Sequence, residues 1–336
     1  MQLGINFPWI NYGWDFGPPP PEWVSSIDEW QAGKRQKIVE TLGELAALGI
    51  ESVRWFILGD GTNYGLGEEA PHLRAGKWRF DPLPSAHPFY DRLSEDFRFL
   101  LSTCRETGLQ LLPSLIDYQW AWSGVVPDGS QSIVKGGRGL ILTDAARREA
   151  FFESVLDPLL QLSLEYREVI VAWELINEPE WVVSPPWYKF WQHDPQRTIH
   201  KSQMKEFLQA GVARINRFEN GVFKSTIGFA YPRSLKEWHS IGVTLDQFHY
   251  YPSPQERLPS LHDGAIIGEL ATAANFRPWA ELSRQTVDER LRLIESRGYP
   301  AAWLWSAGEN GEATSWTAVE KEQVRQYLRD RVSTEA

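Results

Sequence analysis

Eight short apolar runs alternate with longer amphipathic stretches along the 336 residues, and this alternation predicts a (β/α)8 barrel. Two further observations favour a barrel over an open, doubly wound sheet. The composition does not change along the chain, and no linker rich in Pro, Gly and Ser divides it. The GxGxxG turn typical of the open sheet is absent after the first apolar run. We therefore expect a single (β/α)8 domain over residues 1–336.

The predicted strands are runs of β-branched and apolar residues. They are 3–7, 51–57, 109–116, 169–175, 224–229, 245–249, 265–268 and 301–305. Helical periodicity predicts helices at 34–48, 88–106, 145–165, 202–219, 232–240, 283–296 and 318–330. In the first of these, Ile38, Leu42 and Leu45 share one face, and Gly49 fits a C-cap.

The chain between these elements is lengthened on one side only. Long irregular segments, rich in Gly, Pro and aromatic residues, follow the first four strands at 8–32, 58–86, 117–143 and 179–200. The turns that lead from a helix to the next strand are short by comparison. Barrel enzymes build their sites at the carboxyl ends of the strands. The lengthened face is therefore the predicted functional face.

Tryptophan is unusually frequent, with 17 residues. Most fall at predicted strand ends or in the segments that follow: Trp9, Trp14, Trp55, Trp78, Trp120, Trp122, Trp181, Trp187, Trp191, Trp303, Trp305 and Trp316. Trp238 lies on a predicted helix instead. Long loops need aromatic side chains for packing, but indole rings at the mouth of a barrel also suit stacking against sugar rings. Both interpretations remain open for each residue.

Charge and motif content exclude several functions. With 34 basic and 44 acidic side chains, the formal charge of −10 argues against a nucleic-acid partner. No run of 18 apolar residues is present, so no membrane span is expected. Cys104 stands alone, and the histidines form no HxH or HExxH pattern, so we expect neither disulfide nor metal site. No cofactor motif occurs. The first residues do not resemble a signal peptide, which favours a cytoplasmic protein, or a secreted one if a leader was removed.

Two glutamates emerge from the ends of apolar strands. Glu178 ends the fourth strand and is followed by Pro179, and Glu269 ends the seventh. Burial at such positions raises a carboxyl pKa. A lone strand-end glutamate more often caps a helix or pairs with an arginine. Two facing each other across a barrel mouth suit hydrolysis of a glycosidic bond, in which one carboxyl protonates the leaving oxygen while the other attacks or activates water.

The fourth-strand triplet Asn177-Glu178-Pro179, together with Glu269, resembles clan A of the glycoside hydrolases, whose members are retaining (β/α)8 enzymes. Within the clan, His249 and Tyr251 resemble the His-x-Tyr motif of glycoside hydrolase family 5. The third strand departs from the cellulases of that family, because residues 115–120 contain no histidine. The resemblance implies that Glu178 is the acid/base and Glu269 the nucleophile.

The resemblance also implies supporting roles for other residues. Arg54, at the end of the second strand, matches an arginine that supports the nucleophile, and Asn177 is placed to bind the sugar 2-hydroxyl. Trp305, on the last strand, matches the tryptophan platform under the sugar whose bond is cleaved. We group Trp303 of the same strand with these supporting residues. Three acids remain from the residues themselves: Asp15 and Asp117 are candidate hydroxyl binders, and Glu174 is a deeper partner, expected to face Arg54.

The predicted function is thus a retaining β-glycoside hydrolase that cleaves β-linked oligosaccharides of the gluco or manno type, without metal or cofactor. Two alternatives stay open. A non-catalytic carbohydrate-binding barrel would keep the aromatic residues but would have no need of the acid pair. A transglycosidase would share the same covalent intermediate and transfer it to a sugar instead of water.

Overall fold

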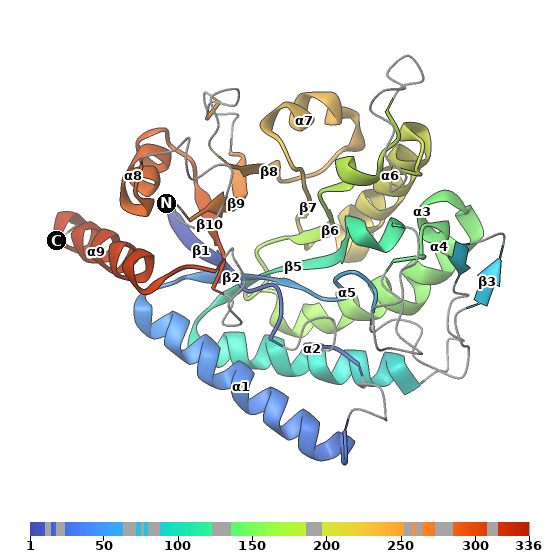
Figure 1. The fold of residues 1–336 in the computed structure, drawn as a ribbon, viewed down its shortest axis with the longest axis horizontal. Coiled ribbons are helices and arrows are strands. Elements are labelled where there is room, and N and C mark those ends of the chain that lie inside the picture. Colours follow the sequence, from blue (N-terminus) through green and yellow to red (C-terminus); the bar gives the residue numbers. More distant parts are fainter. Residues whose placement is uncertain are drawn as a thin grey trace.

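The structure is a computed structural model that describes residues 1–10, 15–17, 24–62, 72–74, 77–79, 88–122, 136–185, 197–251, 258–259, 264–272, 285–307 and 315–335. Eight parallel strands form a barrel, and helices surround it (Figure 1). The predicted (β/α)8 fold is confirmed.

The barrel strands are β1 (Gln2–Asn6), β2 (Ser52–Phe56), β5 (Gln110–Asp117), β6 (Trp173–Asn177), β7 (Ser225–Gly228), β8 (Gln247–Tyr250), β9 (Ile266–Ala271) and β10 (Ala301–Trp305). Their spatial order is β7-β6-β5-β2-β1-β10-β9-β8. A parallel bridge between Phe229 and Phe248 joins the two outer members, and His249 N donates to Phe229 O at 2.7 Å. The sheet therefore closes between β7 and β8, and all eight predicted strands are present.

The helices are α1 (Ile27–Leu48), α2 (Pro88–Thr107), α3 (Leu140–Thr143), α4 (Ala145–Phe151), α5 (Asp157–Ser163), α6 (Lys201–Arg217), α7 (Pro232–Glu237), α8 (Val287–Ser296) and α9 (Ala318–Glu335). A π-helical turn, Phe152–Leu156, connects α4 to α5. Within the described ranges, no helix is both long and apolar enough to cross a membrane.

The first helix begins earlier than the sequence predicted. The side chain of Ser26 accepts a hydrogen bond from Glu29 N and caps the helix, so α1 starts at Ile27 instead of residue 34. The serine followed three residues later by glutamate was the overlooked indication. At the other end Gly49 has a φ of 98°, a left-handed value that suits glycine, and its N–H donates to Ala46 O.

A second difference lies in the segment predicted to be irregular at 58–86. Strands β3 (His72–Arg74) and β4 (Lys77–Arg79) pair there as an antiparallel hairpin apart from the barrel (Figure 1). Three-residue strands carry too little periodicity to be recognised in a sequence.

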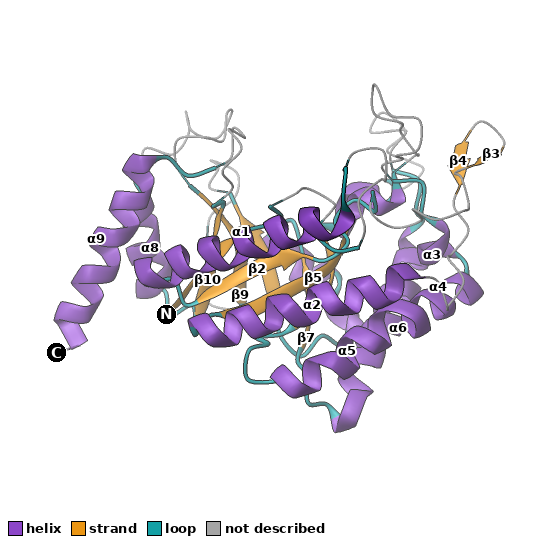
Figure 2. Ribbon diagram, turned by 90° about the horizontal axis from the view of Figure 1, so that it is seen from below, coloured by secondary structure: helices purple, strands orange, loops and turns teal. Residues whose placement is uncertain are grey.

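Each barrel strand turns one face inward and one outward. On the outward face, Trp55 packs edge-on against Phe7, with centroids 5.2 Å apart, and Trp173 packs against Phe97 of α2 at 5.5 Å. Helices α1 and α2 lie across this side of the sheet (Figure 2). Several of the tryptophans at strand ends are thus packing residues.

The inward face has two layers. The lower one, here called the floor, is an apolar cluster of Leu112, Ala172, Ile266, Ala301 and Trp303. A side chain at Gly4 would collide with the Trp303 indole, so glycine is required there to admit the ring. The upper layer, here called the mouth, holds the polar residues at the strand ends. The floor therefore supports the mouth from below.

Candidate active site

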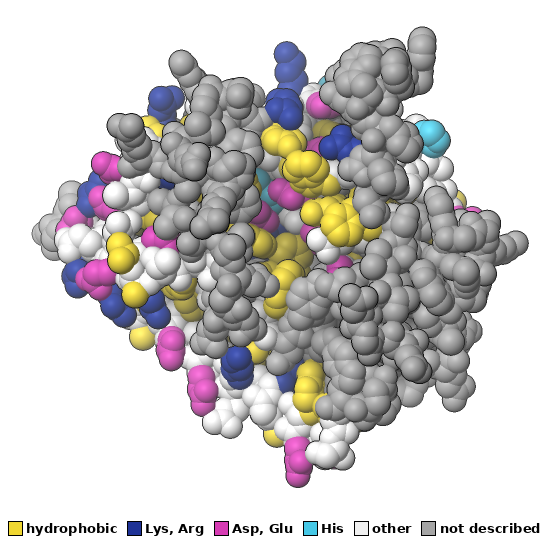
Figure 3. All heavy atoms as spheres, in the orientation of Figure 1, with side chains coloured by type: hydrophobic (Ala, Val, Ile, Leu, Met, Phe, Trp, Pro, Cys, Tyr) yellow, Lys and Arg dark blue, Asp and Glu magenta, His cyan; other side chains and the backbone are white. Residues whose placement is uncertain are grey.

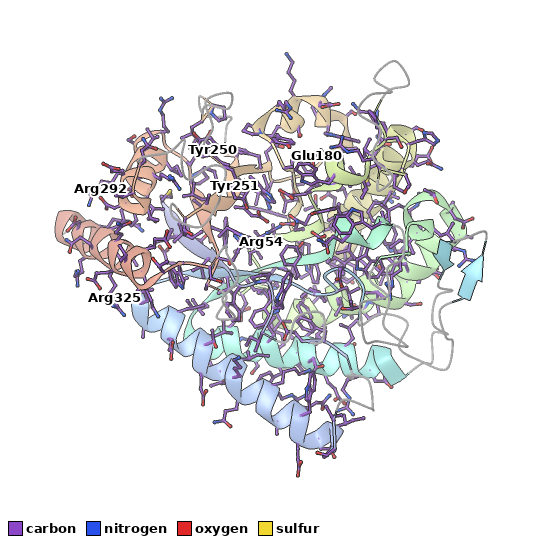
Figure 4. All side chains as sticks on the ribbon, viewed as in Figure 1. Arg54, Glu180, Tyr250, Tyr251, Arg292 and Arg325 are labelled. Atoms are coloured by element: carbon purple, nitrogen blue, oxygen red, sulfur yellow. The ribbon has the colours of Figure 1, made fainter. Side chains whose placement is uncertain are left out.

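Arg54 lies at the centre of the mouth (Figure 4), where it is fully buried and makes five hydrogen bonds. Two of them form a fork to Glu174: Nε to Oε2 at 2.7 Å and Nη2 to Oε1 at 2.6 Å. Nη1 donates to Glu269 Oε1 at 2.8 Å and to Asn6 Oδ1 at 2.8 Å. Nη2 also donates to Asn177 Oδ1 at 2.7 Å. The predicted pairing of Glu174 with Arg54 is confirmed.

One buried cation is thus shared by two buried carboxylates. Burial alone would raise the pKa of Glu174, but the bidentate Arg54 lowers it below its usual value. Glu269 receives only one arginine N–H. Burial raises its pKa, and Arg54 and the Tyr251 hydrogen bond counteract that rise. Glu174 therefore takes most of the neutralisation, and the trio keeps a net negative charge that lies on Glu269.

The second oxygen of Glu269 is also bonded. The Tyr251 hydroxyl donates to Glu269 Oε2, and burial raises the pKa of Tyr251 well above its usual value, so the phenol keeps its proton. With Arg54 on one oxygen and Tyr251 on the other, the Glu269 carboxylate is fixed in orientation. The structure thus brings Tyr251, one residue of the predicted His-x-Tyr pair, against Glu269.

Glu178 sits at a strained point of the backbone. Its φ and ψ are 44° and 51°, a left-handed conformation unusual for a residue with a side chain. The conformation is secured because Glu178 N donates to Gly228 O at 2.7 Å and Pro179 opens a short 3-10 helix, Pro179–Val182. The turn lifts the Glu178 carboxyl out of the strand and towards the mouth.

The surroundings of Glu178 differ from those of Glu269. Its Oε1 lies 2.8 Å from His249 Nδ1, and its Oε2 accepts from Trp181 Nε1 at 2.9 Å. Neither arginine nor lysine bonds to it among the described residues. Burial raises the pKa of Glu178 to about 7, and Arg54 and the Trp181 hydrogen bond only partly oppose the rise. Near neutral pH, Glu178 can therefore hold a proton and release it.

The two carboxyls and His249 form a compact group. One oxygen of Glu178, one of Glu269 and a ring nitrogen of His249 all lie within 4.8 Å of one another. His249 Nδ1 is also 3.4 Å from Glu269 Oε2. Burial lowers the pKa of His249 to about 4, so the ring is neutral at pH 7. Near the middle of the face drawn in Figure 3, acidic and histidine side chains lie together between hydrophobic ones.

This group has the ligand types and spacing that a divalent metal can use. The other partners of each carboxylate favour a different role, because Glu269 already accepts from Arg54 and Tyr251 and Glu178 accepts from Trp181. An arginine against a ligand carboxylate also opposes the binding of a second cation.

Asn177 and Asp117 are brought together at the ends of β6 and β5. Asn177 Nδ2 donates to Asp117 Oδ2 at 2.7 Å, and Asp117 Oδ1 accepts from Gln119 N at 2.9 Å. Burial raises the pKa of Asp117 well above its usual value. The Asn177 amide has a second N–H donor besides the one bonded to Asp117. Asp117 orients that amide.

Gly228, on β7, was not predicted as a site residue. A Cβ there would lie 2.7 Å from Glu174 Oε1 and 3.1 Å from Arg54 Nη2. The absent side chain makes the space in which the two charged groups meet. A glycine inside an apolar strand often marks such a close approach, and that was the available indication.

The predicted aromatic platform lies at the end of β10. Trp305 is partly exposed and packs edge-on against Phe56 at 6.4 Å, while Phe56 lies under the Arg54 guanidinium at 4.9 Å. Trp303, two residues earlier, also faces inward but is fully buried in the floor, beneath the site. The structure thus separates the two tryptophans: Trp305 can meet a ligand, and Trp303 packs under the mouth.

Asp15 lies outside the barrel mouth. Its Oδ2 accepts from Ile10 N at 2.7 Å and from Trp55 Nε1 at 3.3 Å. Trp55 neighbours Arg54 on β2, and since side chains alternate along a strand it points outward where Arg54 points inward. Asp15 is therefore placed to hold the segment after β1 and does not join the other acids.

No protein-family model and no curated protein sequence matches this chain. Solved structures do match it over almost its full length. A β-mannanase from the blue mussel Mytilus edulis is 16% identical, with 98% of this chain and 92% of that chain covered and a TM-score of 0.65. An endo-1,4-β-mannanase from Eisenia fetida is 17% identical, with coverage of 98% and 90% and a TM-score of 0.67. The fold of this chain is the fold of those enzymes.

A further match is an exo-β-1,4-mannosidase from Opitutaceae bacterium strain TAV5. It is 14% identical, with 99% of this chain and 60% of that chain covered and a TM-score of 0.59. These similarities agree with the barrel fold predicted from the sequence. They include both endo- and exo-acting proteins.

Proposed function

We propose that this chain is a retaining β-glycoside hydrolase of clan A, most similar to family 5, with residues 1–336 as one catalytic domain. The observation that carries the proposal is the pair formed by Glu178 and Glu269. Their closest oxygens lie within 4.8 Å, which fits the spacing of about 5–5.5 Å between carboxyls in retaining enzymes, whereas inverting enzymes need about 6.5–9.5 Å. The two acids also have opposite surroundings, as two different roles require.

In the first step Glu269 attacks the anomeric carbon and forms a glycosyl ester, while the proton of Glu178 passes to the departing oxygen. In the second step Glu178, now ionised, takes a proton from water, and that water releases the sugar from Glu269. Arg54 and Tyr251 hold the attacking carboxylate, and the desolvated Glu178 with its pKa of about 7 can serve first as acid and then as base. Neither step needs a metal or a cofactor.

We propose β-linked manno-type oligosaccharides as the substrate class, with gluco-type as the competing class. The neighbours named above, β-mannanases and an exo-β-1,4-mannosidase, support the first. In this proposal the second N–H of Asn177 binds the 2-hydroxyl, whose configuration distinguishes mannose from glucose. In the same proposal, the partly exposed Trp305 stacks under the sugar ring.

A panel of aryl β-glycosides, followed by trapping with the matching 2-fluoro sugar and peptide mapping, tests this proposal. We expect label on the peptide that contains Glu269 and a first product with the substrate's anomeric configuration in NMR spectra. Label on a peptide without Glu269, or an inverted first product, would refute the assignment. Transfer to added sugar acceptors in preference to water would indicate a transglycosidase. Binding without turnover by the intact chain would indicate a carbohydrate-binding barrel.

A further inference from the structure

Trp181 is a residue whose proximity to the acid/base was not foreseen. It lies in the 3-10 helix Pro179–Val182, three residues after Glu178, and its backbone N–H donates to Glu178 O at 3.1 Å. Its indole N–H donates to Glu178 Oε2 at 2.9 Å. The side chain is nevertheless 37% exposed, one of the more exposed large apolar side chains in the described part of the chain. An exposed indole bonded to a catalytic carboxyl calls for an explanation beyond packing.

The indole also contacts groups other than Glu178. The ring lies 6.0 Å from that of Tyr231, and the Arg197 guanidinium lies 5.8 Å over it. The neighbouring Glu180 accepts hydrogen bonds from Ala230 N, which fastens the 3-10 helix to the segment after β7. The indole N–H is thus presented to Glu178 from a fixed support.

The Glu178 carboxyl is therefore held on both sides. His249 Nδ1 lies against Oε1 and Trp181 Nε1 against Oε2, at 2.8 Å and 2.9 Å. Two contacts on opposite oxygens stop rotation of the carboxyl plane, as Arg54 and Tyr251 do for Glu269. A donor to a carboxylate also stabilises its ionised form relative to the protonated one.

We propose that Trp181 is a positioning residue for the acid/base: its indole N–H fixes the plane of the Glu178 carboxyl and limits how tightly Glu178 holds its proton. The inference rests on the proposed function and deepens it. Trp181 matters most when the leaving group is poor, because such a group departs only with a well-aimed proton. It also sets the pH above which that proton is lost.

Several other charged or titratable groups bear on Glu178 from the elements packed around it. They are Arg54 on β2, Asp117 and Tyr118 at the end of β5, Glu174 on β6, Glu180 on its own 3-10 helix, His249 on β8, Tyr251 after β8 and Glu269 on β9. Glu180 is the main competitor as the source of a pH effect, because burial raises its pKa to about 7 as well.

The deciding variant is Trp181→Phe, which keeps an aromatic ring and removes the N–H. For an unactivated β-linked disaccharide we expect kcat/KM to fall about 3- to 10-fold, mostly in kcat, in keeping with the loss of one hydrogen bond to a charged group. For a 2,4-dinitrophenyl glycoside, which needs little acid assistance, we expect a change of less than about twofold. The upper pKa of the kcat/KM profile should rise by about 0.5–1 unit.

Matched variants separate the explanations. Trp30→Phe removes an indole N–H on α1 and should change neither substrate's kinetics. Glu180→Gln should leave the upper pKa of the kcat/KM profile unchanged if Glu178 is its source.

The inference would be overturned, with wild-type turnover intact, by equal losses on both substrates. An upper pKa that does not move in folded Trp181→Phe would overturn it in the same way. Wild-type protein without turnover, or full activity in Glu178→Gln, would instead overturn the proposed function.

Discussion

The floor and the mouth of the barrel differ in how their buried side chains are held. In the floor, Trp303 Nε1 is buried without a hydrogen-bond partner in the described part of the chain, as is Ser52 Oγ beside Gly4, and the floor is otherwise apolar. In the mouth, a single guanidinium makes five hydrogen bonds, and both oxygens of Glu269 are bonded. The floor is packed for shape. The mouth uses hydrogen bonds to place charge, with His249 Nε2 and Gln247 Oε1 also buried without a partner among the described residues.

This difference predicts which substitutions should change stability alone and which should change activity as well. Unbonded polar atoms in the floor cost free energy but touch no reacting group. Charges in the mouth are compensated only by one another, so removing one leaves the others buried without a partner. Changes in the mouth should alter activity first and stability with it, and changes in the floor should alter stability alone.

The largest effect is expected for Arg54→Met. It leaves Glu174 and Glu269 buried without their cation, which should cost about 3–5 kcal/mol of unfolding free energy. We also expect kcat/KM to fall by about 10³-fold or more, because the nucleophile loses both its charge partner and its orientation. Urea unfolding and aryl glycoside kinetics provide the two measurements.

Arg54→Lys, which keeps the charge but not the fork to Glu174, should fall between wild type and Arg54→Met in both stability and activity. Near wild-type turnover in Arg54→Met would contradict the role of Arg54.

A smaller effect is expected for Gly228→Ala. The added methyl group would lie 2.7 Å from Glu174 Oε1 and push the carboxylate off Arg54. We expect kcat/KM to fall about 10- to 100-fold and unfolding to become easier by about 1–3 kcal/mol. Gly43→Ala is the matched control, because nothing lies within 4 Å of a Cβ at that position in α1. It should leave activity unchanged and add up to about 1 kcal/mol of stability. Equal effects of the two alanines would show that the tight approach at Gly228 is unimportant.

Much of the fold and part of the site were predictable from the sequence. Strand alternation and the apolar runs predicted all eight barrel strands. The spacing of Glu174 and Glu178 along one strand predicted that Glu174 would lie deeper and face Arg54, since that inference needs only the alternation of side chains. The inward or outward direction of a side chain, which its own strand sets, was thus predictable.

Residues whose environment is set by loops or by distant strands were not. Asp15 was grouped with the mouth because it follows β1, but its bond to Trp55 Nε1 is made on the outer side of β2. The contact between Trp181 and Glu178 depends on the left-handed turn at Glu178, which no local sequence pattern predicts. The requirement for glycine at position 228 arises from the Arg54 and Glu174 side chains of two other strands. These contacts form only in the folded barrel, so the sequence around each residue does not reveal them.

The two tryptophans of β10 compare floor and mouth directly. Trp303→Phe should reduce the unfolding free energy by about 2 kcal/mol, because the smaller ring leaves a cavity above Gly4, and should change kcat/KM by less than about threefold. Trp305→Phe should behave in the opposite way, with lower activity on oligosaccharides and a stability change of less than about 1 kcal/mol. Thermal unfolding of both variants measures the change in stability, and kinetics on oligosaccharides measures the change in activity. The separation of floor from mouth would fail if Trp303→Phe lost activity as severely as Trp305→Phe.

The last comparison concerns pH and involves two neighbouring acids, Glu178 and Glu180. Burial raises the folded-state pKa of Glu178 and of Glu180 to about 7, above the usual value of 4.5. Between those values the folded protein binds more protons than the unfolded chain, so each acid supports folding at low pH and loses that contribution as the pH rises through 7. Glu178→Gln and Glu180→Gln should each therefore stabilise the protein at pH 8 relative to wild type, by up to about 3 kcal/mol, and not at pH 4. Only Glu178→Gln should abolish turnover of unactivated substrates. If both variants are more stable at pH 8 and only Glu178→Gln loses activity, the active site keeps Glu178 at a cost in stability. Unchanged stability of a variant at pH 8 would mean that the glutamate it replaces is better solvated than its burial indicates.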